Sequence, residues 1–172
     1  MVYSRREYCA VLAGTTTLGL AGCTGLSDGT HDVEYVVSND GDTAQAVVLT
    51  VLASRDSRVR VTFDDGETTT QDADELAVVF GDEWGQITAV EALGDVLDER
   101  DHRVSAGGSE RGEFEDVDSG ASVIGWATPE AGPPPTNGFG SMWCSEGTDI
   151  VDLNVRIRAD GAMEARASCT SR

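Results

Sequence analysis

The sequence contains no lysine, so its basic residues are all arginines. Its 172 residues include 12 Arg against 31 Asp and Glu, a formal net charge of −19. A chain of this charge has no basic patch with which to neutralise phosphates, so nucleic acid is excluded as a partner. The hydrophobic content of 40% is too high for a disordered chain. We therefore expect an acidic, folded domain.

Histidine is also scarce, because the chain has only His31 and His102. A Ser-His-Asp triad would have to use His102, and no serine lies in a nucleophile motif. A blue-copper site needs two histidines, a cysteine and usually a methionine, but no histidine follows Cys144. We expect His102 to be a solvated surface residue. The sequence predicts no catalytic residue, no metal site and no cofactor.

Long hydrophobic runs are absent. The apolar stretch near the N-terminus spans only residues 10–21, about 12 residues, which is too short to cross a hydrocarbon core of about 30 Å. Arg5 and Arg6 precede it, and small residues follow it. A basic start, a short apolar run and small residues in this order are typical of an export signal.

Two parts of this segment resemble known export motifs. Arg5 and Arg6, before a weakly hydrophobic run, resemble a twin-arginine signal in which Tyr8 takes the place of the usual Phe. The end of the run resembles a lipobox, with the residues Leu20, Ala21, Gly22 and Cys23. This resemblance implies cleavage before Cys23 and attachment of a lipid to its thiol, for which a thiolate is a suitable nucleophile. The alternative is a buried N-terminal helix in which Cys23 is a core thiol.

The resemblance divides the chain into three parts. Residues 1–22 would be an export signal that is removed, residues 23–31 a lipidated cysteine with a short tether, and residues 32–172 the folded domain. Arg5, Arg6 and Glu7 would leave with the signal. The mature part would then hold 30 acidic and 10 basic residues, a net charge of about −20.

Such a charge makes a small domain repel itself at ordinary salt. At molar salt the Debye length falls to about 3 Å, and most of this repulsion is screened. Dispersed Asp and Glu without lysine resemble the composition of proteins from extreme halophiles. Combined with the signal and lipobox, the chain resembles haloarchaeal secreted lipoproteins, although the domain itself matches no family closely.

Cysteine use fits an exported protein. Of four cysteines, Cys9 would leave with the signal and Cys23 would carry the lipid. The remaining pair, Cys144 and Cys169, is expected to form a disulfide, the usual state of cysteine pairs outside the cell. A metal or redox pair is the alternative, but the two residues lie far apart in sequence and have no histidine nearby.

The mature chain is dominated by alternating apolar and polar residues, which predicts strands. We expect strands at 33–38, 46–52, 59–63, 76–80, 122–128, 150–157 and 162–169. Asp160 and Gly161 form a hairpin signal that would bring Cys144 and Cys169 together. Seven or eight short strands with Gly and Asp turns predict an all-β, antiparallel β-sandwich of immunoglobulin-like architecture.

Residues 87–100 are ambiguous. Ile87, Val90, Leu93 and Leu97 suit one face of a short helix. The alternative is a strand at 87–92 followed by an irregular segment. The neighbouring strands favour this second interpretation.

A proline run offers the candidate contact surface. It comprises Pro133, Pro134 and Pro135, together with Phe139, Trp143 and, less directly, Trp126. Consecutive prolines favour the polyproline II conformation, and rigid segments and aromatic rings lose little entropy on docking. The alternative is a structural loop whose aromatic residues cap the core.

Four acidic clusters invite a calcium interpretation, but none has the spacing of an EF-hand. They are Asn39/Asp40/Asp42, Asp64/Asp65/Glu67, Asp82/Glu83 and Glu115/Asp116/Asp118. The first two are better explained as hairpin turns.

These observations predict a protein bound to the membrane through lipid on Cys23, on the extracytoplasmic face. There it would act as a non-catalytic binding or structural module with an envelope protein as partner. The alternative is an extracytoplasmic hydrolase or cation-binding protein whose site no motif reveals.

Overall fold

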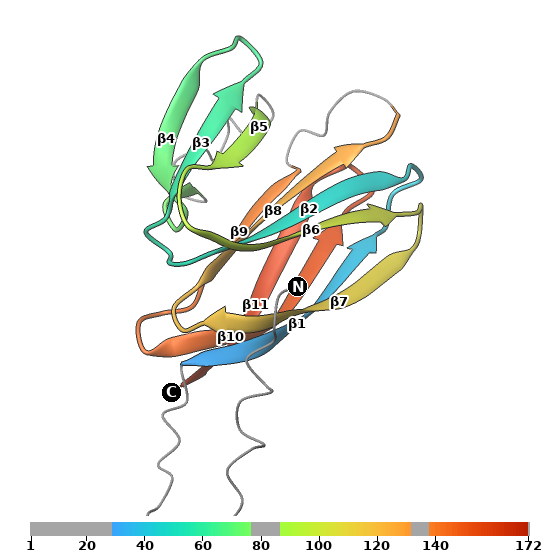
Figure 1. The fold of residues 1–172 in the computed structure, drawn as a ribbon. Coiled ribbons are helices and arrows are strands. Elements are labelled where there is room, and N and C mark those ends of the chain that lie inside the picture. Colours follow the sequence, from blue (N-terminus) through green and yellow to red (C-terminus); the bar gives the residue numbers. More distant parts are fainter. Residues whose placement is uncertain (1–28, 77–86, 132–137, 172) are drawn as a thin grey trace, which may run out of the picture.

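The computed structural model describes residues 29–76, 87–131 and 138–171 (Figure 1). The export signal, the lipobox with Cys23, the proline run 133–135 and nearly all of the strand predicted at 76–80 lie outside these residues. The described residues form eleven strands: β1 (Thr30–Asn39), β2 (Gln45–Leu52), β3 (Arg58–Phe63), β4 (Thr68–Asp72), β5 (Ile87–Ala92), β6 (Val96–Val104), β7 (Ser109–Asp118), β8 (Ser122–Pro129), β9 (Phe139–Met142), β10 (Thr148–Ile157) and β11 (Met163–Ser171).

The strands form three sheets. Sheet A has the order β11-β10-β1-β7, sheet B the order β6-β2-β8-β9, and sheet C the order β4-β3-β5. Sheets A and B make the sandwich, which confirms the predicted all-β fold. One pairing departs from an antiparallel sandwich, because β1 and β10 run parallel, with Tyr35 opposite Leu153.

The main core lies between sheets A and B. Alternation on β1 directs Val33, Tyr35 and Val37 inward, where they meet Val47 and Leu49 of β2. Phe114 of β7 and the inner residues of β10 complete this core, and all of them are buried. Burying a side chain of this kind stabilises the fold by about 1.5–3 kcal/mol.

Sheet C builds a second core on the outer face of sheet B. Leu52, Ile124 and Phe139 of sheet B pack there against Val59 and Val61 of β3 and other residues of sheet C. The three strands of sheet C lie in sequence between β2 and β6, which are neighbours in sheet B. The chain therefore leaves sheet B after β2, forms a small third layer over one end, and returns as β6 (Figure 1).

Several predicted boundaries are wrong. For residues 87–100 the favoured strand at 87–92 is confirmed by β5, whereas the segment expected to be irregular forms β6 from Val96. The sequence analysis placed no strand at β4, β7 or β9. Finally, β1 begins at Thr30, so His31 belongs to a strand and not to the tether.

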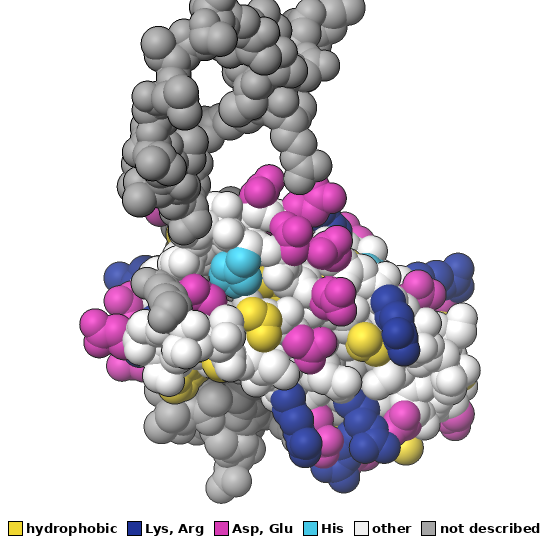
Figure 2. Space-filling model, turned by 90° about the horizontal axis from the view of Figure 1, so that it is seen from below, with side chains coloured by type: hydrophobic (Ala, Val, Ile, Leu, Met, Phe, Trp, Pro, Cys, Tyr) yellow, Lys and Arg dark blue, Asp and Glu magenta, His cyan; other side chains and the backbone are white. Residues whose placement is uncertain are grey.

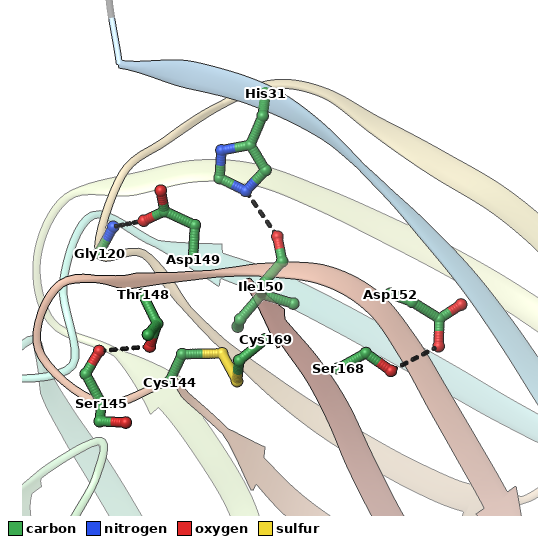
Figure 3. Close-up of a disulfide and its surroundings, with 10 residues drawn as sticks. All are labelled: His31, Gly120, Cys144, Ser145, Thr148, Asp149, Ile150, Asp152, Ser168 and Cys169. Atoms are coloured by element: carbon green, nitrogen blue, oxygen red, sulfur yellow. Dashed lines mark hydrogen bonds between the residues drawn. A yellow bond between two sulfur atoms is a disulfide. The ribbon is translucent and has the colours of Figure 1, made fainter. Parts of the chain in front are cut away.

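The predicted disulfide between Cys144 and Cys169 is present, with their Cα atoms 5.9 Å apart. Cys144 follows β9 of sheet B and Cys169 lies in β11 of sheet A, so the bond joins one edge of each sheet. Beside it, the Nε2 atom of His31 lies 2.5 Å from the Ile150 carbonyl oxygen (Figure 3). The buried Asp149 accepts a hydrogen bond of 3.1 Å from the Gly120 N–H, which holds the β7–β8 turn (Figure 3).

Candidate functional site

A groove lies between sheet B and sheet C, with a volume of about 260 Å³. Its floor is the outer face of sheet B, and its walls are β5 on one side and β6 on the other. The lining residues, which define the groove from here on, are Val48, Thr50, Val90, Glu91, Ala92, Val96, Glu99, Ile124, Gly125, Trp126 and Phe139. Mostly apolar linings with a few polar groups are typical of binding sites in proteins.

The floor follows from strand alternation. On β8, Ile124 and Trp126 point to the outer face of sheet B, because the residues next to them face the main core. Trp126 lies directly opposite Phe139 of β9. Phe139 is 4% exposed, whereas Trp126 is only partly buried. Sheet C thus covers Phe139 and leaves part of the Trp126 ring open to the groove.

The β5 wall is formed by the edge of the strand. Val90, Glu91 and Ala92 all line the groove although they are consecutive. Successive side chains of a strand point to opposite faces, so backbone atoms of this stretch also line the groove, and among the described residues β5 is an edge strand of sheet C. The Glu91 carboxylate is engaged by Arg60, with 2.9 Å between Oε2 and Nη1.

The β6 wall carries a carboxylate. Glu99 lies opposite Thr50 of β2, and the Thr50 hydroxyl donates a hydrogen bond of 3.1 Å to Glu99 Oε2. Among the ion pairs of the described residues, Glu99 is not a partner. The groove therefore presents a carboxylate that forms no ion pair with an arginine of the described residues.

Exposed apolar side chains continue the groove beyond β5. Leu93, Val96 and Leu97 are 39%, 45% and 41% exposed, and all three lie at or near the turn between β5 and β6. Val96 also lines the groove. Neighbouring exposed apolar residues of this size are unusual on a soluble surface and often mark a contact site.

The structure brings together only some of the residues of the predicted contact surface. Phe139 and Trp126 meet in the groove. Trp143 is 41% exposed but does not line the groove, and Pro133, Pro134 and Pro135 lie outside the described residues. The sequence analysis missed Val48, Thr50, Glu99 and the β5 edge. The alternation of β2 and β8 could have indicated the floor, but no local signal shows that sheet C lies beside it.

His102 is half-buried, and not the solvated surface residue that was predicted. It is on β6, and its ring contacts the Tyr35 ring edge to face, with 5.2 Å between their centroids. Its Nε2 atom is buried and has no hydrogen-bond partner in the described part of the chain. Burial lowers the pKa of His102, and burial also raises the pKa of Tyr35. Among the described residues no hydrogen bond joins His102 to a serine, so they give no support to a triad.

Of the first two acidic clusters, the second forms the predicted hairpin turn between the paired strands β3 and β4, whereas the first forms a turn between β1 of sheet A and β2 of sheet B, which do not pair. The Asn39 side chain donates to the Thr43 carbonyl at 2.9 Å and accepts from the Gly41 N–H at 2.9 Å. In the second cluster, Asp65 accepts a hydrogen bond from the Glu67 N–H. Within residues 29–76, 87–131 and 138–171, no three His, Cys, Asp or Glu side chains converge as metal ligands would.

A second hollow lies on the outer face of β10 and β11. It is lined by Asp152, Asn154, Arg156, Glu164, Arg166 and Ser168, and its volume is about 330 Å³. Figure 2 views the molecule from the side of sheet A and shows acidic side chains over much of this face, with arginines gathered mainly at one edge. This hollow has no apolar floor, unlike the groove beside sheet C.

Comparison with protein-family models and with curated proteins gives no match. Among solved structures, the chain is similar to the T6SS lipoprotein TssJ1 from Pseudomonas aeruginosa. The TM-score is 0.46 at 9% identity, and the match covers 81% of this chain and 97% of that one. At these values the similarity carries no inference about function. None of the described residues belongs to a helix long and apolar enough for a membrane span.

Proposed function

We propose that this protein is a lipid-anchored, extracytoplasmic binding module without catalytic activity, and that the groove beside sheet C is its contact site. The observation that carries the binding role is the groove itself. It combines a partly open Trp126, exposed apolar neighbours and a Glu99 carboxylate that has no ion-pair partner in the described part of the chain. Aromatic side chains in such positions dominate the energy of protein contacts.

The anchor is supported by the order of motifs in the sequence. Arg5 and Arg6, the short apolar run and the lipobox-like residues ending at Cys23 occur in the order and spacing that a lipoprotein signal requires. β1 begins at Thr30, seven residues after Cys23. Seven residues span at most about 25 Å when fully extended, so the domain would stay close to the membrane.

The layer order supports a groove that faces away from the anchor. β1, which follows the tether, belongs to sheet A, and the groove lies on the far face of sheet B. Figure 1 shows sheet C on the opposite side of the sandwich from the start of β1. A domain tethered through β1 could therefore present the groove to another envelope protein.

The anchor is tested by Cys23→Ala, with Cys9→Ala as the matched control. Lipid attachment requires the thiol of the residue after the cleavage site, so we expect Cys23→Ala to release the protein from membranes. Cys9→Ala should remain with the membrane pellet in molar salt. Sedimentation of the Cys23→Ala variant with membranes would overturn the anchor.

The binding role is tested by recovering the protein from its own membranes in molar salt. Trp126→Ala removes the open aromatic ring of the groove, whereas Trp143→Ala removes an exposed aromatic ring outside it. A companion that is present in stoichiometric amount with wild type and Trp143→Ala, and lost with Trp126→Ala, supports the groove as contact site. Equal recovery with both variants assigns the contact to another surface.

A further inference from the structure

We infer that the groove binds an extended peptide strand that adds to the open edge of β5, with apolar side chains on the floor and a basic side chain beside Glu99. This inference rests on the proposed function, because it names the kind of partner that the groove would accept. It follows from three features of the described residues: the backbone direction along β5, the faces of the two sheets, and the charge of the groove.

The first feature is the direction of the backbone groups of β5. The Leu93 N–H donates to the Arg58 carbonyl at 2.8 Å, so the backbone groups of Leu93 face β3. In an antiparallel pair, backbone groups of successive residues point alternately to the two sides of the strand. The N–H and C=O groups of Val90 and Ala92 therefore point away from β3, toward the groove.

Those groups have no strand partner among residues 29–76, 87–131 and 138–171. Within the described residues, β5 pairs with β3 alone and forms the edge of sheet C. Addition of a peptide strand to an exposed edge is a recurring mode of recognition, in which main-chain hydrogen bonds supply affinity. Here the open edge forms one wall of an apolar groove, so a strand added to β5 would also bury side chains.

The second feature is the floor beneath that strand. The face of sheet C that packs on sheet B is formed by Val59, Val61, Val90 and Ala92. A strand added beside β5 would continue this face toward Trp126 and the neighbouring residues of the floor. Its alternate side chains would point down to sheet B, and apolar residues at these positions would complete the second core.

The third feature is charge. Glu99 projects from β6 at the far wall, and no described arginine pairs with it. A domain with a net charge of −19 also favours a cationic partner over an acidic one. The partner strand would therefore carry arginine or lysine within reach of Glu99.

The probe is a short synthetic peptide of alternating valine and arginine, blocked at both ends. It is titrated into the isotope-labelled domain in molar salt while the amide signals of Val90 and Ala92 and the indole N–H signal of Trp126 are followed by NMR. We expect all three signals to shift and hydrogen exchange at Val90 and Ala92 to slow. The same peptide with its alternate backbone nitrogens methylated should not bind, because it cannot pair with an edge.

Two proline variants at opposite edges of sheet C isolate the role of the β5 edge. Ala92→Pro removes an N–H that faces the groove, and we expect at least a tenfold loss of affinity for the peptide. Thr70 lies opposite Arg60 on β4. By the same alternation, the N–H and C=O groups of Thr70 point away from β3, toward the outer edge of β4. Thr70→Pro is therefore the matched control, and we expect it to bind the peptide with wild-type affinity.

The charge contribution is measured with Glu99→Gln. We expect a loss of up to about fivefold for the valine–arginine peptide and no change for a valine–glutamine peptide, because an exposed ion pair contributes little energy. Equal affinity of the two peptides for wild type would overturn the basic partner.

The outcomes separate this inference from the proposed function. Slow exchange at Val90 and Ala92 without peptide would mean that the edge is already paired, and would overturn strand addition. Binding of the N-methylated peptide, or normal binding by Ala92→Pro, would overturn it as well. In either case a membrane companion lost only with Trp126→Ala would leave the groove as the contact site. Loss of that dependence on Trp126 would remove the proposed function itself.

Discussion

Gly112→Ala should destabilise the domain far more than the loss of one hydrogen atom suggests. Gly112 of β7 lies directly opposite Tyr35 of β1. A Cβ atom at position 112 would lie 2.2 Å from the Tyr35 hydroxyl oxygen and 2.4 Å from its Cζ atom. Ordinary contacts begin at 3.4 Å. The tyrosine ring would therefore have to move by about 1 Å in a core packed like a crystal.

The surroundings leave little room for this movement. Tyr35 is 3% exposed, and its ring centroid lies 4.8 Å from that of Phe114 and 5.2 Å from that of His102. Overpacking of this kind costs about 1–3 kcal/mol. For a domain of this size each kcal/mol lowers the Tm by about 2–4 °C, so we expect a decrease of about 2–12 °C.

Thermal unfolding in molar salt, followed by circular dichroism, measures this effect. Gly94→Ala is the control, because a Cβ atom at position 94 has no atom within 4 Å, and we expect a change within about 0.5 kcal/mol. In a Tyr35→Val background the ring is gone, so Gly112→Ala should cost much less than in wild type. An equal cost in both backgrounds would refute the clash as the cause.

Three further predictions concern charge, protonation and the disulfide. The Tm should rise markedly between about 0.1 M and 3 M KCl, because screening removes the self-repulsion of the acidic chain; a Tm that does not move would remove the halophile interpretation. Burial, the largest effect, and Arg100 lower the pKa of His102, while Glu110 and Asp101 raise it. As pH falls below about 6.5, His102 therefore takes up a proton more readily in the unfolded chain than in the folded one. The free energy of unfolding, measured by urea titration, should decrease with falling pH more steeply in wild type than in His102→Phe. An equal dependence of the free energy of unfolding on pH in the two proteins would contradict this. Replacing Cys144 and Cys169 together by Ser should cost about 3 kcal/mol, from a loop of 25 residues; an unchanged urea midpoint would show that the bond does not stabilise the fold.

The sequence predicted the elements in which one face is buried and the other is solvated. The β10–β11 hairpin is the clearest case, since Leu153, Val155 and Ile157 are buried and alternate with polar residues. The Asp160–Gly161 turn then fixed the register that brings Cys144 and Cys169 together. Local periodicity and turn chemistry were sufficient there.

Periodicity failed where strands are short, polar or separated by a tight turn. β4 has the sequence TTTQD and lies at an edge, so it carries no apolar alternation. The helical spacing of Ile87, Val90, Leu93 and Leu97 arose by chance, because these residues belong to two consecutive strands and the turn between them. Ile87 is buried on β5, whereas Leu93 and Leu97 are exposed on either side of the turn that contains Gly94.

The groove was hidden from the sequence because it depends on where the third layer stops. An outer sheet face in a two-layer sandwich is usually polar, yet Val48, Ile124, Trp126 and Phe139 make this one apolar. Sheet C explains only part of that apolar surface, because it buries Ile124 and Phe139 but leaves Trp126 partly open. If sheet C had one more strand beside β5, that strand would cover the outer face of β2. The apolar floor therefore has the composition of a core that lacks one strand, which is why an added strand is the occupant that fits it.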